Sequence, residues 1–171
     1  KRQINQKYTP EKIHELSMMN MKLFDEKRKI GENESHICQL IRDDSIEDFI
    51  SYVNKTNFSL TTTIESSIFE TNSFLLKKDP TLIEYSAFFG SIQIFRYLYL
   101  NGVELKPSIW IYAIHGNNPE LIHLLEENKI KPQDETYREI LKESIKCHHF
   151  DITNYIQNNF FQNNQFDEDD E

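Results

Sequence analysis

The chain has 171 residues, which is enough for one domain with its own core and short for two. Hydrophobic residues make up 38% of it and aromatic residues 12%, but no apolar run approaches the roughly 20 residues that a membrane-spanning helix needs. The net charge of −9 opposes contact with phosphate backbones, so we expect neither a membrane nor a nucleic-acid partner.

The first 31 residues (1–31) are predicted to form an N-terminal helical cap. Thr9 and Pro10 suit the N-cap and first position of a helix, apolar residues follow at helical spacing, and Gly31 suits its C-cap. We expect this helix to cover the first apolar face of the domain that follows. This N-terminal segment is also basic. A minor hypothesis for function is therefore an RNA or DNA adaptor that binds through Lys1, Arg2, Lys7 and Lys12.

The beginning of the chain and its cysteines suggest a cellular compartment. No hydrophobic signal-peptide region opens the sequence, and Cys38 and Cys147 lie too far apart to suggest a disulfide framework. We therefore expect reduced thiols in an intracellular, cytoplasmic protein. Because the sequence does not begin with Met, we also expect it to be a piece of a longer chain.

Residues 32–161 are predicted to form a repeat domain, because the middle of the chain matches itself. A shift of 27 residues places "DPTLIEYSAFFGSIQIFRYLYLNGV" over "KPSIWIYAIHGNNPELIHLLEENKI", so that Tyr85 meets Tyr112 and Leu98 meets Leu125. A third copy lies 31 residues further on, and a fainter one lies 45 to 46 residues upstream. The four copies cover about residues 36–57, 80–106, 107–132 and 134–161.

Each copy has the pattern of two short antiparallel helices joined by a tight turn. In the best-defined copy, Gly90 permits the turn and Gly102 ends the second helix with a left-handed cap. One pair cannot bury its apolar faces alone, whereas stacked pairs make a continuous core. The sequence therefore predicts an all-α solenoid of three to four stacked antiparallel helix pairs, followed by a disordered acidic tail over residues 162–171.

The best-defined copy resembles the ankyrin repeat. The stretch "TLIEYSAFFGSIQIFRYLYLNGVEL" follows the family pattern T-P-L-H-x-A-A-x-x-G and then a helix that ends in L-L-x-x-G-A. Phrases such as "SIFETNSFLLKKDPTLIEY" and "ESIKCHH" make the segment from about residue 39 to 160 similar to the divergent ankyrin-type domains abundant in trichomonad protozoa. Most proteins of that group are known only as domains of unknown function.

The chain departs from the family pattern in three respects. Leu82 replaces the proline and Glu84 the histidine, which predicts that the usual turn hydrogen bond is missing. Asn117 stands where the second copy needs a turn glycine, although Gly116 is adjacent. The spacings of 27 and 31 residues are shorter than the roughly 33 residues typical of ankyrin, so we expect the β-hairpin fingers to be shortened or absent.

The sequence carries no recognised catalytic motif: it has no GxSxG elbow, HExxH, P-loop or dinucleotide-binding glycine pattern. We therefore expect neither an enzyme nor a cofactor. The sharpest metal candidate is the run Cys147-His148-His149, with His36 and Cys38 as distant partners, because zinc prefers such ligands. Adjacent residues on a helix point in different directions, so we interpret the run as a turn cap and predict no metal site.

The resemblance implies a partner-binding surface. In ankyrin stacks, the residue before the Ala pair and the two residues after it line the concave face that binds protein partners. The equivalent positions here are Tyr85, Phe88, Phe89, Tyr112, His115, Gly116, Glu143, Lys146 and Cys147. The alternative is that Phe88 and Phe89 pack under the upstream segment, for example against Phe69, Phe74 or Leu76, and belong to the core.

Two functions follow from this fold by analogy. The first is non-catalytic recognition of a protein partner on the concave face. The second is a constitutive structural subunit of an intracellular assembly, in which a constant neighbour fills the same face. A transient regulatory partner should wash off at high salt, whereas a permanent one should not.

Overall fold

The structure, a computed structural model, describes residue 14 and residues 20–161. The predicted helix start at Thr9, the basic residues 1–12 and the acidic tail 162–171 lie outside the described residues. The described part contains helices and no strand, which confirms the all-α class, and none of its helices is long and apolar enough to cross a bilayer. In chain order the elements are α2 (Met21–Ile30), α3 (His36–Arg42), α4 (Ile46–Thr56), the 3₁₀ turn η1 (Leu75–Lys77), α5 (Leu82–Phe89), α6 (Ile92–Leu100), α7 (Ile109–Gly116), α8 (Pro119–Glu127), α9 (Arg138–Lys146), α10 (Phe150–Ile156) and the π-helical turn η2 (Gln157–Phe161).

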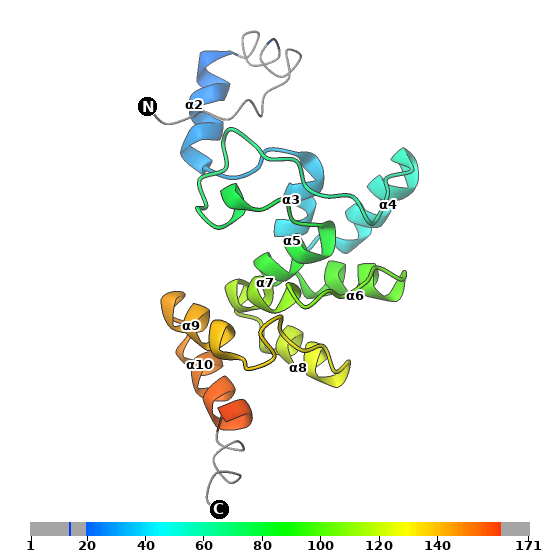
Figure 1. Ribbon diagram of the computed structural model, residues 1–171. Helices are drawn as coiled ribbons and strands as arrows, with labels where there is room; N and C mark the ends of the chain where they lie inside the picture. Colours follow the sequence, from blue (N-terminus) through cyan, green and yellow to red (C-terminus); the bar gives the residue numbers. More distant parts are fainter. Residues whose placement is uncertain (1–13, 15–19, 162–171) are drawn as a thin grey trace, which may run out of the picture.

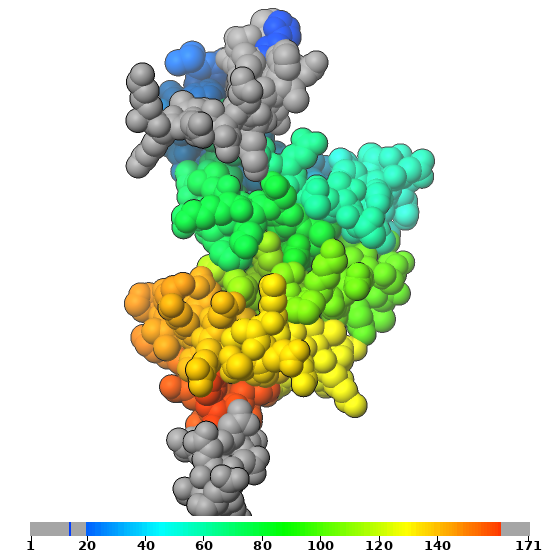
Figure 2. All heavy atoms as spheres, viewed as in Figure 1, coloured from blue at the N-terminus to red at the C-terminus, as the bar shows by residue number. Residues whose placement is uncertain are grey.

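The helices from α3 to α10 form pairs that stack in chain order (Figure 1). Within pairs, α3 packs on α4, α5 on α6, α7 on α8 and α9 on α10. Between pairs, α3 contacts α5, α5 contacts α7 and α7 contacts α9, so the first helices form a continuous row. Figure 2 shows the same order on the surface, where each colour of the chain adjoins the next along an elongated body. Stacking of this kind buries faces that a single pair would leave exposed.

The turn inside each pair contains one residue in the left-handed conformation. The φ angles are 48° at Asp44, 67° at Gly90, 48° at Asn117 and 58° at His148. These positions are separated by 46, 27 and 31 residues, which are the shifts that align the sequence with itself. Asp, Asn and His tolerate this conformation better than most side chains, which explains how three turns form without glycine.

The end of the second helix repeats in the same way. In the first three pairs, a residue one or two positions after the second helix adopts a positive φ, of 50°, 84° and 55°. The next amide then donates to the carbonyl five residues earlier, at 3.0 or 3.1 Å, so each helix closes with the same hydrogen bond. The three left-handed residues are Asn57, Gly102 and Lys129.

Equivalent apolar residues of successive pairs fill the core. Leu98, Leu125 and Ile156 have no exposed surface, and Trp110 is equally enclosed. The Trp110 indole N–H donates to the Ile130 carbonyl at 2.7 Å, so its one polar group is satisfied. The core therefore continues through the stack from one pair to the next.

Glu84 corrects the prediction that the turn before α5 lacks its hydrogen bond. The Thr81 amide donates to Glu84 Oε2 at 2.9 Å, and the Glu84 amide donates to Thr81 Oγ1 at 3.4 Å, which makes a capping box. The other carboxylate oxygen, Oε1, accepts from the Ser108 hydroxyl at 2.7 Å. The carboxylate thus caps its own helix and also reaches the next pair.

The long connection between the first two pairs, residues 57–81, supports α2. The Phe24 and Phe69 rings meet edge to face with centroids 5.4 Å apart, and Lys27 Nζ lies 5.7 Å from the centre of the Phe69 ring. Gly31 ends α2 at φ 72°, as predicted, and its carbonyl accepts from the Thr71 amide at 2.9 Å. These contacts attach α2 to the connection.

We expect Asp44→Ala to lower the free energy of unfolding by about 1–2 kcal/mol, because Asp44 caps a helix of the next pair. Its carboxylate accepts from the Gln93 amide at 3.1 Å and from the Ile94 amide at 3.0 Å, and both amides lie in the first turn of α6. Alanine also tolerates φ 48° poorly. Urea unfolding measures the change, with the exposed neighbour Asp43→Ala as the control. Equal losses in the two variants would contradict the cap.

Candidate functional site

The structure buries three side chains that were predicted to line a partner-binding face. Tyr85, Phe88 and Tyr112 are 1%, 8% and 5% exposed. The Tyr85 hydroxyl accepts a hydrogen bond from Arg42 Nη1 at 3.1 Å, and burial raises the pKa of that hydroxyl. The prediction that these three rings line an accessible partner-binding face is therefore wrong.

Phe74, in the 57–81 connection, covers two of these rings, Phe88 and Tyr112. Its ring stacks on Phe88 with centroids 5.7 Å apart, meets Tyr112 edge-on at 5.1 Å and lies 4.4 Å from the His115 ring. The alternative that Phe88 packs under the upstream segment is thereby confirmed. The connection can reach this far because it is much longer than the connections after α6 and α8.

The other mapped positions differ in their surroundings. Phe89 is half-buried and its ring contacts Phe88 and Tyr85, with centroids 5.0 and 4.8 Å apart. Gly116 is the last residue of α7 and lies against the backbone of α5, where it has no room for a side chain. Lys146 is exposed. Among the mapped positions at the α7–α9 end, the accessible side chains are therefore mainly polar.

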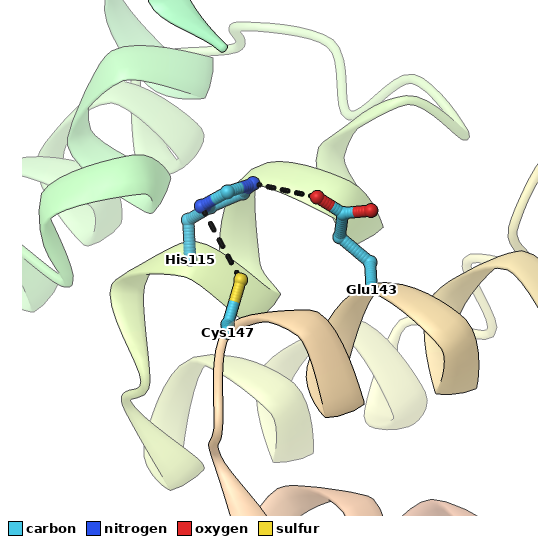
Figure 3. A group of neighbouring side chains, drawn as sticks. All are labelled: His115, Glu143 and Cys147. Carbon is cyan, nitrogen blue, oxygen red and sulfur yellow. Dashed lines mark hydrogen bonds and ion pairs between the residues drawn. The ribbon is translucent and has the colours of Figure 1, made fainter. Parts of the chain in front are cut away.

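Three of the mapped positions converge between α7 and α9 (Figure 3). His115 Nδ1 lies 3.6 Å from Cys147 Sγ, and His115 Nε2 lies 3.3 Å from Glu143 Oε1. The Nε2 contact does not have the geometry of a hydrogen bond, so this buried nitrogen has no hydrogen-bond partner. The other oxygen of Glu143 pairs with Lys146 Nζ at 2.7 Å. Within residues 14 and 20–161 this is the one group of three or more His, Cys, Asp or Glu side chains close enough to hold a metal ion.

Local structure explains why these side chains meet. Glu143 and Cys147 are four residues apart at the end of α9, so they project from one face of the helix. His115 stands in the last turn of α7, the neighbouring helix of the row. The Phe74 and Phe88 rings flank the imidazole at 4.4 and 4.9 Å. The donors therefore sit in a partly enclosed place between two helices.

The protonation states follow from this setting. Burial lowers the pKa of His115, although Glu143 acts in the opposite direction, so the imidazole is neutral at neutral pH. Burial, and then the Glu143 carboxylate, raises the pKa of the Cys147 thiol. Glu143 raises the pKa of Lys146 through their hydrogen bond, which keeps the ammonium charged. At neutral pH the Cys147 thiol therefore keeps its proton.

The order thiol, imidazole, carboxylate also occurs in enzymes with a cysteine nucleophile, but the surroundings here oppose that chemistry. Burial and the Glu143 carboxylate raise the pKa of the Cys147 thiol, and together they outweigh the Lys146 ammonium, which acts to lower it. Reactive cysteines instead have a lowered thiol pKa. The arrangement thus offers donor atoms, not an activated nucleophile.

The run Cys147-His148-His149 divides between two roles. His148 adopts the left-handed conformation of the turn, which is the position that the alignment gave it. His149 is the N-cap residue of α10, but its side chain makes no capping hydrogen bond. The interpretation of this residue as a side-chain cap is therefore wrong. Cys147 instead faces His115, and the distant partner Cys38 is fully buried in α3.

Two cavities lie away from this group. One of about 430 Å³ is bordered by α2, α3, α4 and the 57–81 connection, and Lys27, His36 and Tyr52 are among its lining residues. Another of about 220 Å³ lies between α8 and α10 and is lined by Ile122, Tyr155 and their neighbours. Neither cavity contains His115, Glu143 or Cys147.

Comparisons of the chain with protein-family models, with curated proteins and with solved structures give no significant match.

Proposed function

We propose that this chain is an ankyrin-like, non-catalytic recognition module that binds a protein partner along the row of first helices. The observation that carries the proposal is the regular stacking of α3, α5, α7 and α9 into one row. Stacked helix pairs create extended surfaces, which repeat proteins use to bind partners. The two left-handed positions in each of the first three pairs and the resemblance of residues 81–105 to the ankyrin repeat support the same proposal.

The binding surface that we propose includes only some of the residues that are equivalent to the partner-binding positions of ankyrin stacks. Phe74 covers Phe88 and Tyr112, so the partner would contact the α7–α9 end of the row and the edge of Phe89. Lys146 is exposed there, and Glu143 is partly exposed beside it. Polar groups at the rim with few apolar anchors are typical of interfaces that form and dissociate.

Site-specific photo-crosslinking in native lysate tests this proposal. A crosslinking amino acid is placed at Phe89 or Lys146 on the row, and at Gln93 or Glu127 on the second helices as matched controls. We expect one partner protein to be captured from both row positions and from neither control. Capture from the second helices alone, or from none of the four positions, would reject binding along the row.

The second candidate is a constitutive subunit, with the same face filled by a constant neighbour. Washing the uncrosslinked complex at low and high salt separates the two, because salt screens the attraction between a partner and exposed charges such as that of Lys146. A recognition module should release its partner at high salt. Retention at a fixed stoichiometry would favour the permanent subunit.

A further inference from the structure

We infer that His115, Glu143 and Cys147 form a binding site for a divalent transition metal of the zinc class, which would join α7 to α9. Each residue offers one donor atom, and the three donor atoms lie within 4.8 Å of one another. They come from two neighbouring helices of the row, so a bound ion would bridge the third and fourth helix pairs.

The separation of the first two donors suits zinc. Zinc bonds of about 2.3 Å to sulfur and 2.0–2.1 Å to nitrogen, at a tetrahedral angle, place the two ligands about 3.5 Å apart. The observed separation between Cys147 Sγ and His115 Nδ1 is 3.6 Å. An ion could therefore bind this pair without a change in the helix backbones.

Glu143 supplies the third donor by a rotation of its side chain. Its Oε1 now lies on the Nε2 side of the imidazole, whereas the ion would bind on the Nδ1 side with the thiolate. Glutamate has three side-chain torsions, and the carboxylate already lies within the 4.8 Å limit of the group. Its Oε2 can keep the Lys146 ion pair, and water can complete a fourth position.

The chemistry of the donors favours such a cation. Thiolate and imidazole select zinc-like ions over magnesium or calcium, which prefer oxygen ligands alone.

Binding involves a balanced proton transfer. The Cys147 S–H bond breaks, its proton goes to solvent, and the sulfur lone pair forms the bond to the metal. The neutral imidazole and the carboxylate give no proton. The Phe74 and Phe88 rings lie against the imidazole and would keep it in place as the ion binds.

Titration of the full chain with Co²⁺, as a spectroscopic probe for zinc, tests the site. We expect a thiolate-to-cobalt charge-transfer absorption in the near ultraviolet that Zn²⁺ abolishes by displacement. Cys147→Ser should remove this absorption, and Glu143→Gln should weaken Co²⁺ binding by at least about 10-fold, as changes around metal ligands commonly do. Circular dichroism shows whether each variant is folded.

Two matched controls identify the residues involved. The chain has two cysteines, so Cys38→Ser should leave the absorption unchanged. His123 and Glu126 have the same 3.3 Å separation as His115 and Glu143 but face a tyrosine instead of a thiol, so His123→Gln should also have no effect.

The melting temperature gives a second measurement that does not depend on absorption. Zinc should raise the melting temperature of the unaltered chain but not that of Cys147→Ser, because a ligand stabilises only the protein that binds it. No charge-transfer absorption at a large excess of Co²⁺, its persistence in Cys147→Ser, or its loss in Cys38→Ser would each overturn the proposal. These outcomes require no protein partner, so they are distinct from a failure of the proposed recognition function.

Discussion

Gly116→Ala should destabilise the protein by about 3 kcal/mol or more, although alanine is the better helix former. Gly116 is the last residue of α7 and has no positive φ, so the backbone alone would favour alanine, by at most about 1 kcal/mol. A Cβ at this position would stand 2.1 Å from the Ala87 carbonyl oxygen and 2.8 Å from the Gly90 amide nitrogen. Both are backbone atoms, so α5 and α7 would have to move apart, and the packing of two pairs would be lost.

Gly102→Ala is the matched control, because Gly102 has the opposite properties. It needs a left-handed backbone at φ 84°, but an added Cβ there would meet nothing within 4 Å. We expect a loss of about 1–2 kcal/mol from the backbone conformation alone. Urea unfolding of both variants measures the difference, and a larger loss at Gly102 would show that α5 and α7 do not approach as described.

The sequence alone ranks these two glycines in the reverse order. A glycine that ends a helix is easily predicted to be sensitive, and Gly102 has that place in the repeat. Gly116 is displaced by one residue from the turn position and therefore looks dispensable. Its requirement comes from the crossing of two helices whose residues lie 26 to 29 positions apart in the chain, which only the tertiary structure brings into contact.

Leu98→Ala and Leu125→Ala should each lower the free energy of unfolding by about 2–5 kcal/mol. Both leucines have no exposed surface and occupy equivalent places in successive pairs. Removing either side chain leaves a cavity in the close-packed core, where the surroundings close only partly around it. Urea unfolding monitored by circular dichroism measures the loss.

Leu100→Ala provides the control on the same helix, α6. Leu100 is 81% exposed, so the same truncation should change the free energy of unfolding by no more than about 0.5 kcal/mol. If Leu98→Ala lowered the free energy of unfolding no more than Leu100→Ala, the register in which the helix pairs stack would be wrong. A loss in Leu98→Ala without one in Leu125→Ala would show that the pairs unfold separately.

The sequence by itself determined the helical class, the spacing of the copies and the register of the core. These features are local or periodic: a turn requires a residue that tolerates the left-handed conformation, and a buried helix face requires apolar residues at helical spacing. The shifts of 27 and 31 residues therefore place Gly90, Asn117 and His148 at equivalent turns in the structure. The equivalent leucines Leu98 and Leu125 are buried for the same reason.

The mapping also selected the residues of the proposed metal site, but for another purpose. His115, Glu143 and Cys147 hold three different mapped positions in two neighbouring copies, so the alignment alone puts them on the same row. The alignment assigned that row of residues to partner binding, and it could not give the distances between their side chains. The 3.6 Å contact between the thiol and the imidazole depends on how closely α7 and α9 pack, which no repeat pattern specifies.

Only the tertiary structure decided which mapped residues stay accessible. Phe74 lies in a connection with no helical period and no equivalent in the other copies, yet its ring covers Phe88, Tyr112 and one side of His115. A periodic pattern shows which residues repeat and cannot show what an irregular segment will cover. The burial of Phe88 and the lack of space at Gly116 therefore result from long-range packing, because both depend on backbone and rings from other parts of the chain.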